Sequence, residues 1–330
     1  MLEIISKFLS PSKDLEEQVI EYRKDGLTKI GCRINIKRAQ RVKQARQEVD
    51  FSELIQKSSQ GCFFCPENIE KATPKFLPEI TPEGRIVLGE TTVFPNLFPF
   101  AEHHAVAAIC KKHFLDLNEF TQKQIEDALA ASLDYFKRIK KAKYFYINWN
   151  HLPPSGASIV HPHLQLLADN KPTYLLELYL KASAAYYKKH GENYWLKLIK
   201  NEEELGKRFI ARTGSIAWLA AYAPLGNNEV IAIFEDASSI MDLEHHISHF
   251  AKGLKKILAA YSNLGVRSFT LTTYSAPEKA SNFCLNTKLV SRPSPQRYYT
   301  SDSGFMETLH HERVAEHLPE KLAEYIRKFF

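Results

Sequence analysis

The sequence contains little that would build a membrane-spanning or disulfide-linked protein. No apolar run in its 330 residues approaches the roughly 20 residues that a transmembrane helix needs. The chain starts with an early acidic residue, Glu3, and lacks a signal peptide's apolar core and small-residue cleavage site. Its five cysteines, an odd number in a long chain, argue against a disulfide framework. We therefore expect a cytoplasmic protein with no membrane partner.

Extremes of composition are also missing. The chain is 44% hydrophobic and 25% charged, which is typical of a globular protein large enough to bury a sizeable core in one broad domain or two ordinary ones. Its net charge of +6 mildly favours anionic ligands but is too diffuse to require nucleic acid. The densest basic segment, residues 33–46, favours a solvated or phosphate-facing segment over RNA binding, because no aromatic residues interleave it. Its cations are Arg33, Lys37, Arg38, Arg41, Lys43 and Arg46.

The most informative stretch runs from Asn150 to Gln165. It follows an apolar run, residues 144–149, that predicts a buried strand, and it passes through a loop of Pro, Gly and Ser. His161 and His163 stand two apart, so on an extended segment both rings lie on one face, which Gln165 continues. Pro162 between them fixes φ and stiffens the pair.

The loop itself has the chemistry of a phosphate-binding turn. Gly156 permits close approach of the backbone, and the Ser158 hydroxyl with neighbouring amides can bind phosphate oxygens. A chance pair of histidines on a loop remains the alternative for His161 and His163 taken alone.

A second motif is the Cys62-x-x-Cys65 pair. Two cysteines at this spacing form a knuckle that grips a tetrahedral metal ion, although two more ligands are needed. A thioredoxin-like redox pair is less favoured, because no helical pattern follows Cys65. Cys110 lies inside a predicted strand, where it fits a small core residue.

The second half of the sequence repeats the first at an offset of 124 to 125 residues. The apolar strand at 106–109 recurs at 230–233, the helix predicted at 120–141 recurs around 243–257, and the strand at 144–150 recurs at 268–274. Such a long internal repeat indicates a duplicated supersecondary unit. In the second copy, Asn286 and Lys288 stand where the histidine motif would fall.

Outside the repeat, leucines and isoleucines at helical spacing predict an amphipathic helix within residues 1–24, followed by a strand at 31–36. The tail from Leu318 predicts a helix started by a proline.

The pattern of Asn150, Gly156-x-Ser158 and His161-Pro-His163-x-Gln165 resembles the active-site strand of the galactose-1-phosphate uridylyltransferase branch of the histidine-triad (HIT) superfamily. The resemblance covers roughly residues 60–330 and implies an α+β fold of tandem duplicated HIT-like units, with an antiparallel sheet flanked by helices. We expect an N-terminal extension at 1–60, a catalytic unit at 61–205 and a degenerate unit at 206–330.

The same resemblance implies one structural zinc ion per chain. By position, its ligands are Cys62, Cys65, His113 and His161. Such a set leaves no open position, which is typical of a structural site. The ion would fasten the N-terminal loop to the back of the catalytic strand and, by holding His161, orient the neighbouring His163.

The resemblance also implies a nucleotidyltransferase in which His163 attacks the α-phosphorus of a nucleoside diphosphate derivative. A nucleotidyl-histidine then passes the nucleotide to a second phosphate-bearing substrate. Gln165 would hold the phosphoryl oxygens, and its lack of a titratable proton favours transfer over hydrolysis. The expected substrate-binding residues are Asn150, Gly156, Ser158 and Phe94. Phe94 would pack against the base, and the alternative is that it is a plain core residue.

Three functions stay open at this point. The first is a uridylyltransferase-like enzyme of galactose metabolism, with a nucleotide sugar and a sugar phosphate as substrates. The second is a phosphorylase of a nucleotide sugar or dinucleoside polyphosphate, with phosphate as acceptor, favoured by the poor match of residues 305–316 to a hexose-phosphate segment. The third is a non-catalytic nucleotide-binding protein. We also expect a homodimer.

Overall fold

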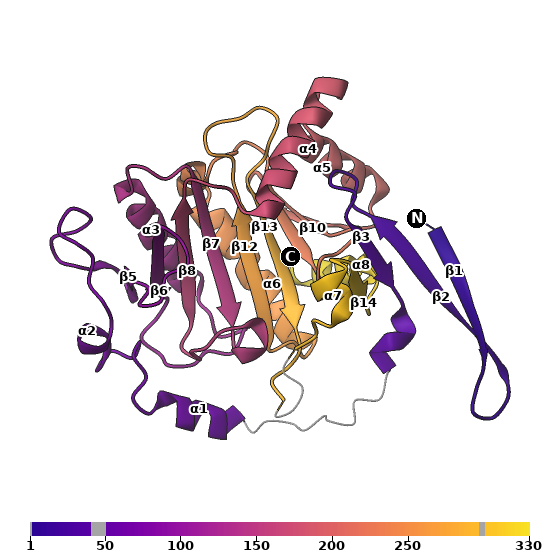
Figure 1. Cartoon of the computed structure of the whole chain (residues 1–330), viewed down its shortest axis with the longest axis horizontal. Helices are drawn as coiled ribbons and strands as arrows, with labels where there is room; N and C mark the ends of the chain where they lie inside the picture. The colour runs from indigo at the N-terminus through magenta and orange to yellow at the C-terminus, as the bar shows by residue number, and fades with distance from the viewer. Residues whose placement is uncertain (1, 41–50, 297–300) are drawn as a thin grey trace.

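The computed structural model describes residues 2–40, 51–296 and 301–330, and its centre is one ten-stranded sheet (Figure 1). Every pairing in this sheet is antiparallel. The strand order is β4-β5-β6-β8-β7-β12-β13-β11-β10-β9. Their bounds are β4 Ile86–Leu88, β5 Thr91–Pro95, β6 His103–Ala108, β7 Tyr144–His151, β8 His163–Asp169, β9 Phe209–Thr213, β10 Ile216–Ala220, β11 Val230–Phe234, β12 Ser268–Tyr274 and β13 Asn286–Arg292.

Two equivalent halves of five strands meet at β7 and β12. The order β4-β5-β6-β8-β7 on one side is matched by β9-β10-β11-β13-β12 on the other. Each half adds a long helix after its third strand, α3 (Gln122–Arg138) and α6 (Ile247–Asn263). The predicted class, α+β with tandem duplicated units and an antiparallel sheet flanked by helices, is confirmed. The division of the chain at residues 60 and 205 stays a prediction.

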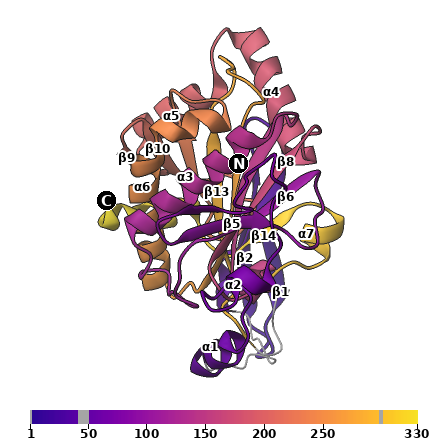
Figure 2. The same cartoon turned by 90° about the vertical axis from the view of Figure 1, so that its left-hand side faces the viewer.

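Helices α3 and α6 pack side by side on the same face of the sheet, and Figure 2 shows α6 on the side opposite α7. The apolar stripe predicted for α3, including Leu129 and Phe136, is buried against Phe145, Ile147 and Trp149 of β7. Because side chains alternate along a strand, the residues between these three point to the opposite face. Apolar packing on one face thus leaves the other face free for polar side chains.

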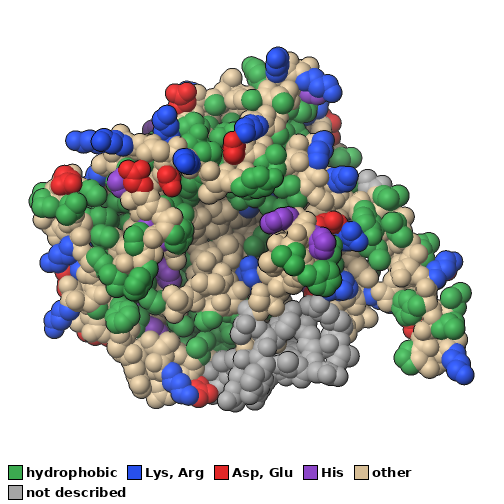
Figure 3. Space-filling view, in the orientation of Figure 1, with side chains coloured by type: hydrophobic (Ala, Val, Ile, Leu, Met, Phe, Trp, Pro, Cys, Tyr) green, Lys and Arg blue, Asp and Glu red, His purple; other side chains and the backbone are tan. Residues whose placement is uncertain are grey.

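The opposite face is covered by helices over the second half and by the loop at Cys62–Cys65 over β5 and β6. Over the second half, α4 (Tyr174–His190) and α5 (Tyr194–Leu205) bury an apolar cluster against β10 and β11. The sequence analysis did not predict α5. Over the middle of the sheet, around β7 and β12, this face is hollowed (Figure 3).

The N-terminal segment is a β-hairpin, so the amphipathic helix predicted within residues 1–24 is wrong. Strands β1 (Leu2–Leu9) and β2 (Leu15–Lys24) pair along their length, with Ile4 opposite Ile20 and Ile5 opposite Val19. These β-branched residues favour a strand, and that preference outweighs the helical spacing of a few leucines. With β3 (Gly31–Ile34) and β14 (Arg313–Ala315) the hairpin forms a second sheet, ordered β1-β2-β3-β14, which projects from the body (Figure 1).

Short helices complete the chain. No helix in the described part of the chain is long and apolar enough to cross a membrane. The predicted C-terminal helix is confirmed as α8, which has a proline in its first turn as expected. The short α-helices are α1 Phe51–Ser59, α2 Ile69–Ala72, α7 Phe305–Leu309 and α8 Pro319–Ile326, and the 3₁₀ helices are Ile36–Gln40, Pro153–Ser155, Ile240–His245 and Arg327–Phe329.

One carboxylate, Glu320 in α8, ties the N-terminal sheet to the main sheet. Its oxygens accept hydrogen bonds from Arg23 of β2 at 3.0 and 3.1 Å and from Arg208, just before β9, at 2.8 Å. Both guanidinium groups are buried and lie over the Tyr222 ring. Burial acts to raise the pKa of Glu320, but the hydrogen bonds from the two arginines outweigh it and leave that pKa lowered.

We predict that Glu320→Gln lowers the free energy of unfolding by about 1–3 kcal/mol at pH 7, because two buried cations lose a shared counter-charge. Since the folded-state pKa is lowered, this stabilisation is present above the ordinary value of about 4.3 and is lost as pH falls through the folded value. Urea unfolding at pH 7 and at pH 3.5 measures the loss of unfolding free energy and its dependence on pH. The exposed Glu324→Gln on the same helix is the control and should change little. An effect of equal size at both pH values would contradict the assignment.

Candidate active site and metal centre

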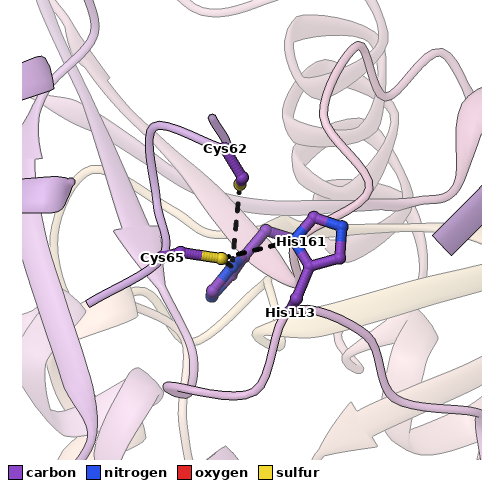
Figure 4. A group of neighbouring side chains, drawn as sticks. All are labelled: Cys62, Cys65, His113 and His161. Carbon is purple, nitrogen blue, oxygen red and sulfur yellow. Dashed lines mark hydrogen bonds between the residues drawn. The ribbon is translucent and has the colours of Figure 1, made fainter. Parts of the chain in front are cut away.

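Cys62, Cys65, His113 and His161 form a cluster whose four ligand atoms all lie within 4.8 Å of one another (Figure 4). Cys65 Sγ is 3.4 Å from His113 Nδ1 and 3.6 Å from His161 Nδ1, and Cys62 Sγ is 4.0 Å from His161 Nδ1. Four ligands on a tetrahedral ion with bonds of 2.0–2.3 Å are separated by about 3.3–3.8 Å. The structure thus brings together all four predicted ligands, and they fit a closed Cys₂His₂ site that could hold a metal ion.

The outer nitrogens of both histidines are already engaged. His161 Nε2 lies 2.7 Å from the carbonyl oxygen of Cys110, and His113 Nε2 lies 2.9 Å from Ser58 Oγ. Burial lowers the pKa of His161 to about 4 and also lowers the pKa of His113, so both rings are neutral at pH 7. A neutral His161 that donates through Nε2 has its lone pair on Nδ1, facing the two sulfurs. Such outer hydrogen bonds are the usual way in which ligand rings are oriented. Cys110 itself is buried beside the cluster, as predicted.

The cysteine loop folds as a compact knuckle. The backbone N–H of Cys65 donates to the carbonyl of Cys62, and the Asn68 side chain donates to the same carbonyl at 3.0 Å. Phe64, between the cysteines, sets its ring edge-on to His163 with centroids 5.3 Å apart. The knuckle therefore packs directly on the second histidine of the motif.

His163 is the first residue of β8 and is buried. Its Nδ1 lies 2.8 Å from the carbonyl oxygen of His161, so Nδ1–H donates there and the lone pair is left on Nε2. Burial lowers the pKa of His163, although the hydrogen bond to His161 acts in the opposite direction. The ring is accordingly a neutral imidazole with a fixed tautomer, which is the form that acts as a nucleophile.

Gln165 is held by a histidine that the sequence analysis missed. His104 Nδ1 accepts from the backbone N–H of Phe100 at 3.4 Å, so in the neutral ring the proton is on Nε2, which lies 2.9 Å from Gln165 Oε1. Burial lowers the pKa of His104 and keeps the ring neutral. With its oxygen held in this way, Gln165 has its amide N–H₂ as the end that can donate to a ligand. Only the sheet register reveals the contact, since 61 residues separate the two.

Asparagines and threonines continue this face across the middle of the sheet. Asn148 lies opposite Gln165 on β8 and opposite Thr272 on β12, and Asn150 lies opposite Thr270. Thr272 Oγ1 donates to Asn148 Oδ1 at 2.6 Å, and Asn148 Nδ2 donates to the carbonyl of Gln165 at 3.3 Å. The middle of the sheet, whose face is hollowed in Figure 3, therefore has a floor of neutral hydrogen-bonding groups around β7 and β12, of which the sequence analysis predicted Asn150 and Gln165.

The loop between β7 and β8 places the other predicted residues beside this floor. Gly156 has a φ of +93°, a conformation that favours glycine, and a Cβ built there would lie 3.6 Å from Asn150 Nδ2. Ser158 is exposed two residues later. Leu152 also has a positive φ, of 68°, which is strained for a branched side chain. The structure thus brings Gly156 and Asn150 together.

Phe94 is buried, as the alternative of a core residue expects. Its side chain is only 1% exposed and packs edge-on against Phe64 at 5.2 Å. A buried ring offers no face for a base to stack on, so Phe94 is a core residue that supports Phe64 from behind. The apolar spacing of β5 gave no means of telling these roles apart.

The second half contains the same backbone geometry without the histidines. Asn286 Nδ2 donates to the carbonyl of Cys284 at 3.0 Å, as His163 does to the carbonyl of His161. Lys288, in the place of Gln165, is buried and forms an ion pair with Glu229 at 2.7 Å. The equivalent face is thus filled by a salt bridge beneath α4, whose Tyr179 ring lies 5.5 Å from the Lys288 ammonium.

The basic segment at 33–46 is described only in part. Arg33 pairs with Glu312 at 2.6 Å and stacks on Tyr22, which accounts for one of its cations. Arg41, Lys43 and Arg46 lie outside the described residues.

Comparisons with known proteins identify a relative by sequence and solved structures of similar fold. No protein-family model matches the chain. An uncharacterised protein of Archaeoglobus fulgidus is 31% identical over 328 residues, which cover 99% of this chain and 97% of the relative.

Solved structures show the same architecture at lower identity. An ADP-glucose phosphorylase from Arabidopsis thaliana with bound ADP-glucose superposes with a TM-score of 0.74 at 18% identity, covering 94% of this chain and 98% of that one. A uridylyltransferase superposes with a TM-score of 0.69 at 18% identity and the same coverage. The chain therefore belongs to one family with the archaeal protein, and it shares its fold with the ADP-glucose phosphorylase and the uridylyltransferase.

Proposed function

We propose that the protein is a nucleotidyltransferase that works through a nucleotidyl-histidine on His163. The observation that carries the proposal is the hydrogen bond from His163 Nδ1 to the His161 carbonyl, which leaves a lone pair on Nε2 beside the polar hollow. In the first step, Nε2 forms a bond to the α-phosphorus of a nucleotide sugar, and the bond from that phosphorus to the oxygen of the departing sugar 1-phosphate breaks. In the second step, a phosphate oxygen of the acceptor attacks the same phosphorus and displaces His163.

The chain's other residues bind and orient the phosphoryl group. The Gln165 amide, held by His104, donates to the phosphoryl oxygens in both steps without offering a titratable proton. Asn150, Gly156 and Ser158 border the same space and bind phosphate or ribose oxygens. Phosphate monoesters are good leaving groups, so little acid catalysis is needed.

Zinc is the metal that the Cys62, Cys65, His113 and His161 set favours, because thiolate and imidazole in a closed tetrahedron are its usual structural ligands. The bound ion would tie the cysteine loop to His161 and supply no open position for substrate.

The acceptor decides between the two enzyme classes. A sugar 1-phosphate makes the protein uridylyltransferase-like, whereas inorganic phosphate makes it a phosphorylase, the activity named for the Arabidopsis protein. Phe305 and Leu309 of α7, in the segment that would bind a hexose phosphate, are exposed. This exposure is the reason to keep inorganic phosphate as the second candidate acceptor. Incubation with UDP-glucose or ADP-glucose, and then with either acceptor, separates the two by product. Absence of any adduct by intact-protein mass spectrometry would leave a nucleotide-binding protein without catalysis.

The functional form in this proposal is a homodimer. The projecting N-terminal hairpin supports it: β3 pairs with β2 only at residues 21–24, so the outer part of the hairpin is a two-stranded ribbon, which is marginally stable in water.

We predict that His163→Ala lowers nucleotide transfer at least about a thousandfold, because no other group can carry the nucleotide. The variant should still fold and bind nucleotide. Turnover assays, thermal melts and the adduct mass measure these separately, and His245→Ala, at an exposed histidine, is the control. A variant that keeps a tenth of wild-type turnover would show that the nucleophile is another residue.

Replacing Gln165 by histidine should raise hydrolysis relative to transfer by about tenfold, since a group that can donate a proton would stand beside the intermediate. The ratio of free nucleoside monophosphate to transferred product measures this effect. An unchanged ratio would remove the argument that Gln165 selects transfer.

The purified protein should contain about one zinc per chain. Cys62→Ser should lose the ion and melt roughly 10 °C lower, because the binding energy of a structural metal is folding energy. Cys284→Ser, which changes the buried cysteine at the position equivalent to His161, is the matched control and should keep full zinc content. Elemental analysis gives the stoichiometry, and a Cys62→Ser protein with normal zinc would contradict the site.

A further inference from the structure

The outer half of the β1–β2 hairpin exposes apolar side chains on both of its faces. On one face Ile5 lies opposite Val19 and Leu9 opposite Leu15, and on the other Ile4 lies opposite Ile20. Large apolar side chains with 40% to 67% of their surface exposed are Leu2, Ile4, Ile5, Phe8, Leu9, Leu15 and Val19. Isolated exposed residues are common, but a continuous group of this kind marks a surface that binds something.

Strand β1 is also an open sheet edge. It pairs with β2 on one side, and no other strand in the described part of the chain pairs with it. Its outer edge therefore presents the unpaired N–H and C=O groups of an extended segment of 8 residues. Such an edge is a template for another strand unless charges, proline or a bulge block it. β1 has no proline, and its only charges are Glu3 and Lys7.

We propose that β1 pairs antiparallel with β1 of a second copy of this chain, with the twofold axis at Ile5. In this register Ile5 lies opposite Ile5, Glu3 of each copy lies opposite Lys7 of the other, and Leu2 lies opposite Phe8. A twofold axis makes every such contact occur twice, as an isologous interface requires. The two small sheets then join into one continuous sheet of eight strands.

The charges select this register over its neighbours. A shift of two residues in either direction keeps the faces but sets Glu3 or Lys7 opposite Ile5. A shift of one residue would set Glu3 and Lys7 opposite even-numbered residues, whose side chains lie on the other face of β1. Directly opposite residues in a pleated pair have their side chains on the same face, so this register is excluded. Only the register centred on Ile5 pairs the two charges, and opposite charges directly across a strand pair are stabilising.

Side chains of β2 also favour the register centred on Ile5. Lys7 already forms an ion pair with Glu17 of β2, so in the dimer its ammonium lies between that carboxylate and Glu3 of the second copy. Val19 of β2 extends the central row on either side, giving four β-branched residues across the joined sheet. A two-stranded ribbon thus becomes the middle of a larger sheet, which removes its marginal stability.

This pairing rests on the proposed homodimer and not on the proposed chemistry. A monomeric protein would remove both the homodimer and the pairing. A dimer that fails the test below would remove the pairing alone, and the activity of His163 bears on neither.

The test is a cysteine placed on the axis. In the proposed register the two Cα atoms of residue 5 are about 4.5–5.5 Å apart, within the range of about 4.4–6.8 Å that a disulfide spans. Ile5→Cys should therefore form a covalent dimer under mild oxidation. Val19→Cys is the matched control, because three strand spacings of about 4.8 Å separate it from its equivalent. All five native cysteines are buried, so the background is low.

Charge exchange tests the register independently. Glu3→Lys sets lysine opposite Lys7 of the second copy while facing Glu21 in its own hairpin, so it weakens association without loosening the hairpin. We expect at least a tenfold rise in the dimer Kd by analytical ultracentrifugation (about 1.4 kcal/mol). The Kd should recover to within about threefold in the Glu3→Lys, Lys7→Glu, Glu17→Lys triple variant, in which residue 7 keeps an opposite charge across its own hairpin. A monomer at all concentrations, equal cross-linking through Val19→Cys, or an unchanged Kd in Glu3→Lys would overturn the pairing.

Discussion

The pairing of β7 with β12 is the contact on which the rest of the molecule depends. It joins the two five-stranded halves, and it sets Asn148 opposite Thr272, two residues that are 124 apart and therefore equivalent in the repeat. The local twofold axis passes between them, and their side chains share a hydrogen bond of 2.6 Å. Side-chain hydrogen bonds reinforce the seam: the backbone N–H of Ile147 donates to Thr273 Oγ1, and Ser268 Oγ donates to the carbonyl of His151. Without this seam the polar floor beside His163 would be an open sheet edge.

His161 links the Cys/His cluster to the proposed nucleophile through two different parts of one residue. Its ring faces Cys62 and Cys65 while its Nε2 donates to the carbonyl of Cys110, and its own carbonyl accepts the proton of His163 Nδ1. An ion held by the cluster would anchor the His161 ring and with it the chain segment whose carbonyl fixes the tautomer of His163. The cluster residues would therefore affect the proposed chemistry without contacting substrate.

Motif spacing predicted contacts between residues that are close in sequence, whereas contacts between distant residues depend on the sheet register. The strand at residues 144–149, the Cys62–Cys65 pair and the duplication followed from spacing, whereas His113 and His161 were grouped with the cysteines only through the family resemblance. His104 was not predicted, because nothing in the sequence says which residue of β6 faces Gln165. The sequence left open whether Phe94 packs against a base or in the core, because an apolar strand has the same pattern whether its ring contacts a ligand or the neighbouring Phe64. The N-terminal hairpin was mistaken for a helix because exposure on both faces erases the alternation by which a strand is recognised.

The two halves show how a duplicated fold can keep one geometry in both copies while the proposed chemistry is confined to the first. Both keep the bond from the motif side chain to the carbonyl two residues earlier, through His163 in one and Asn286 in the other. An asparagine donates to that carbonyl as the histidine does, but its side chain is not a nucleophile. The second half therefore keeps the hydrogen bond and lacks the group that the proposed reaction needs. In the second half the open face is closed by α4 and α5, and the cation that replaces Gln165 is neutralised by Glu229. A buried pair of this kind is tolerated only when both charges are satisfied, so Lys288 and Glu229 depend on each other. Closing this face gives the second half an additional apolar core, and through the β7–β12 pairing that half supports the polar face to which we assign ligand binding in the first half.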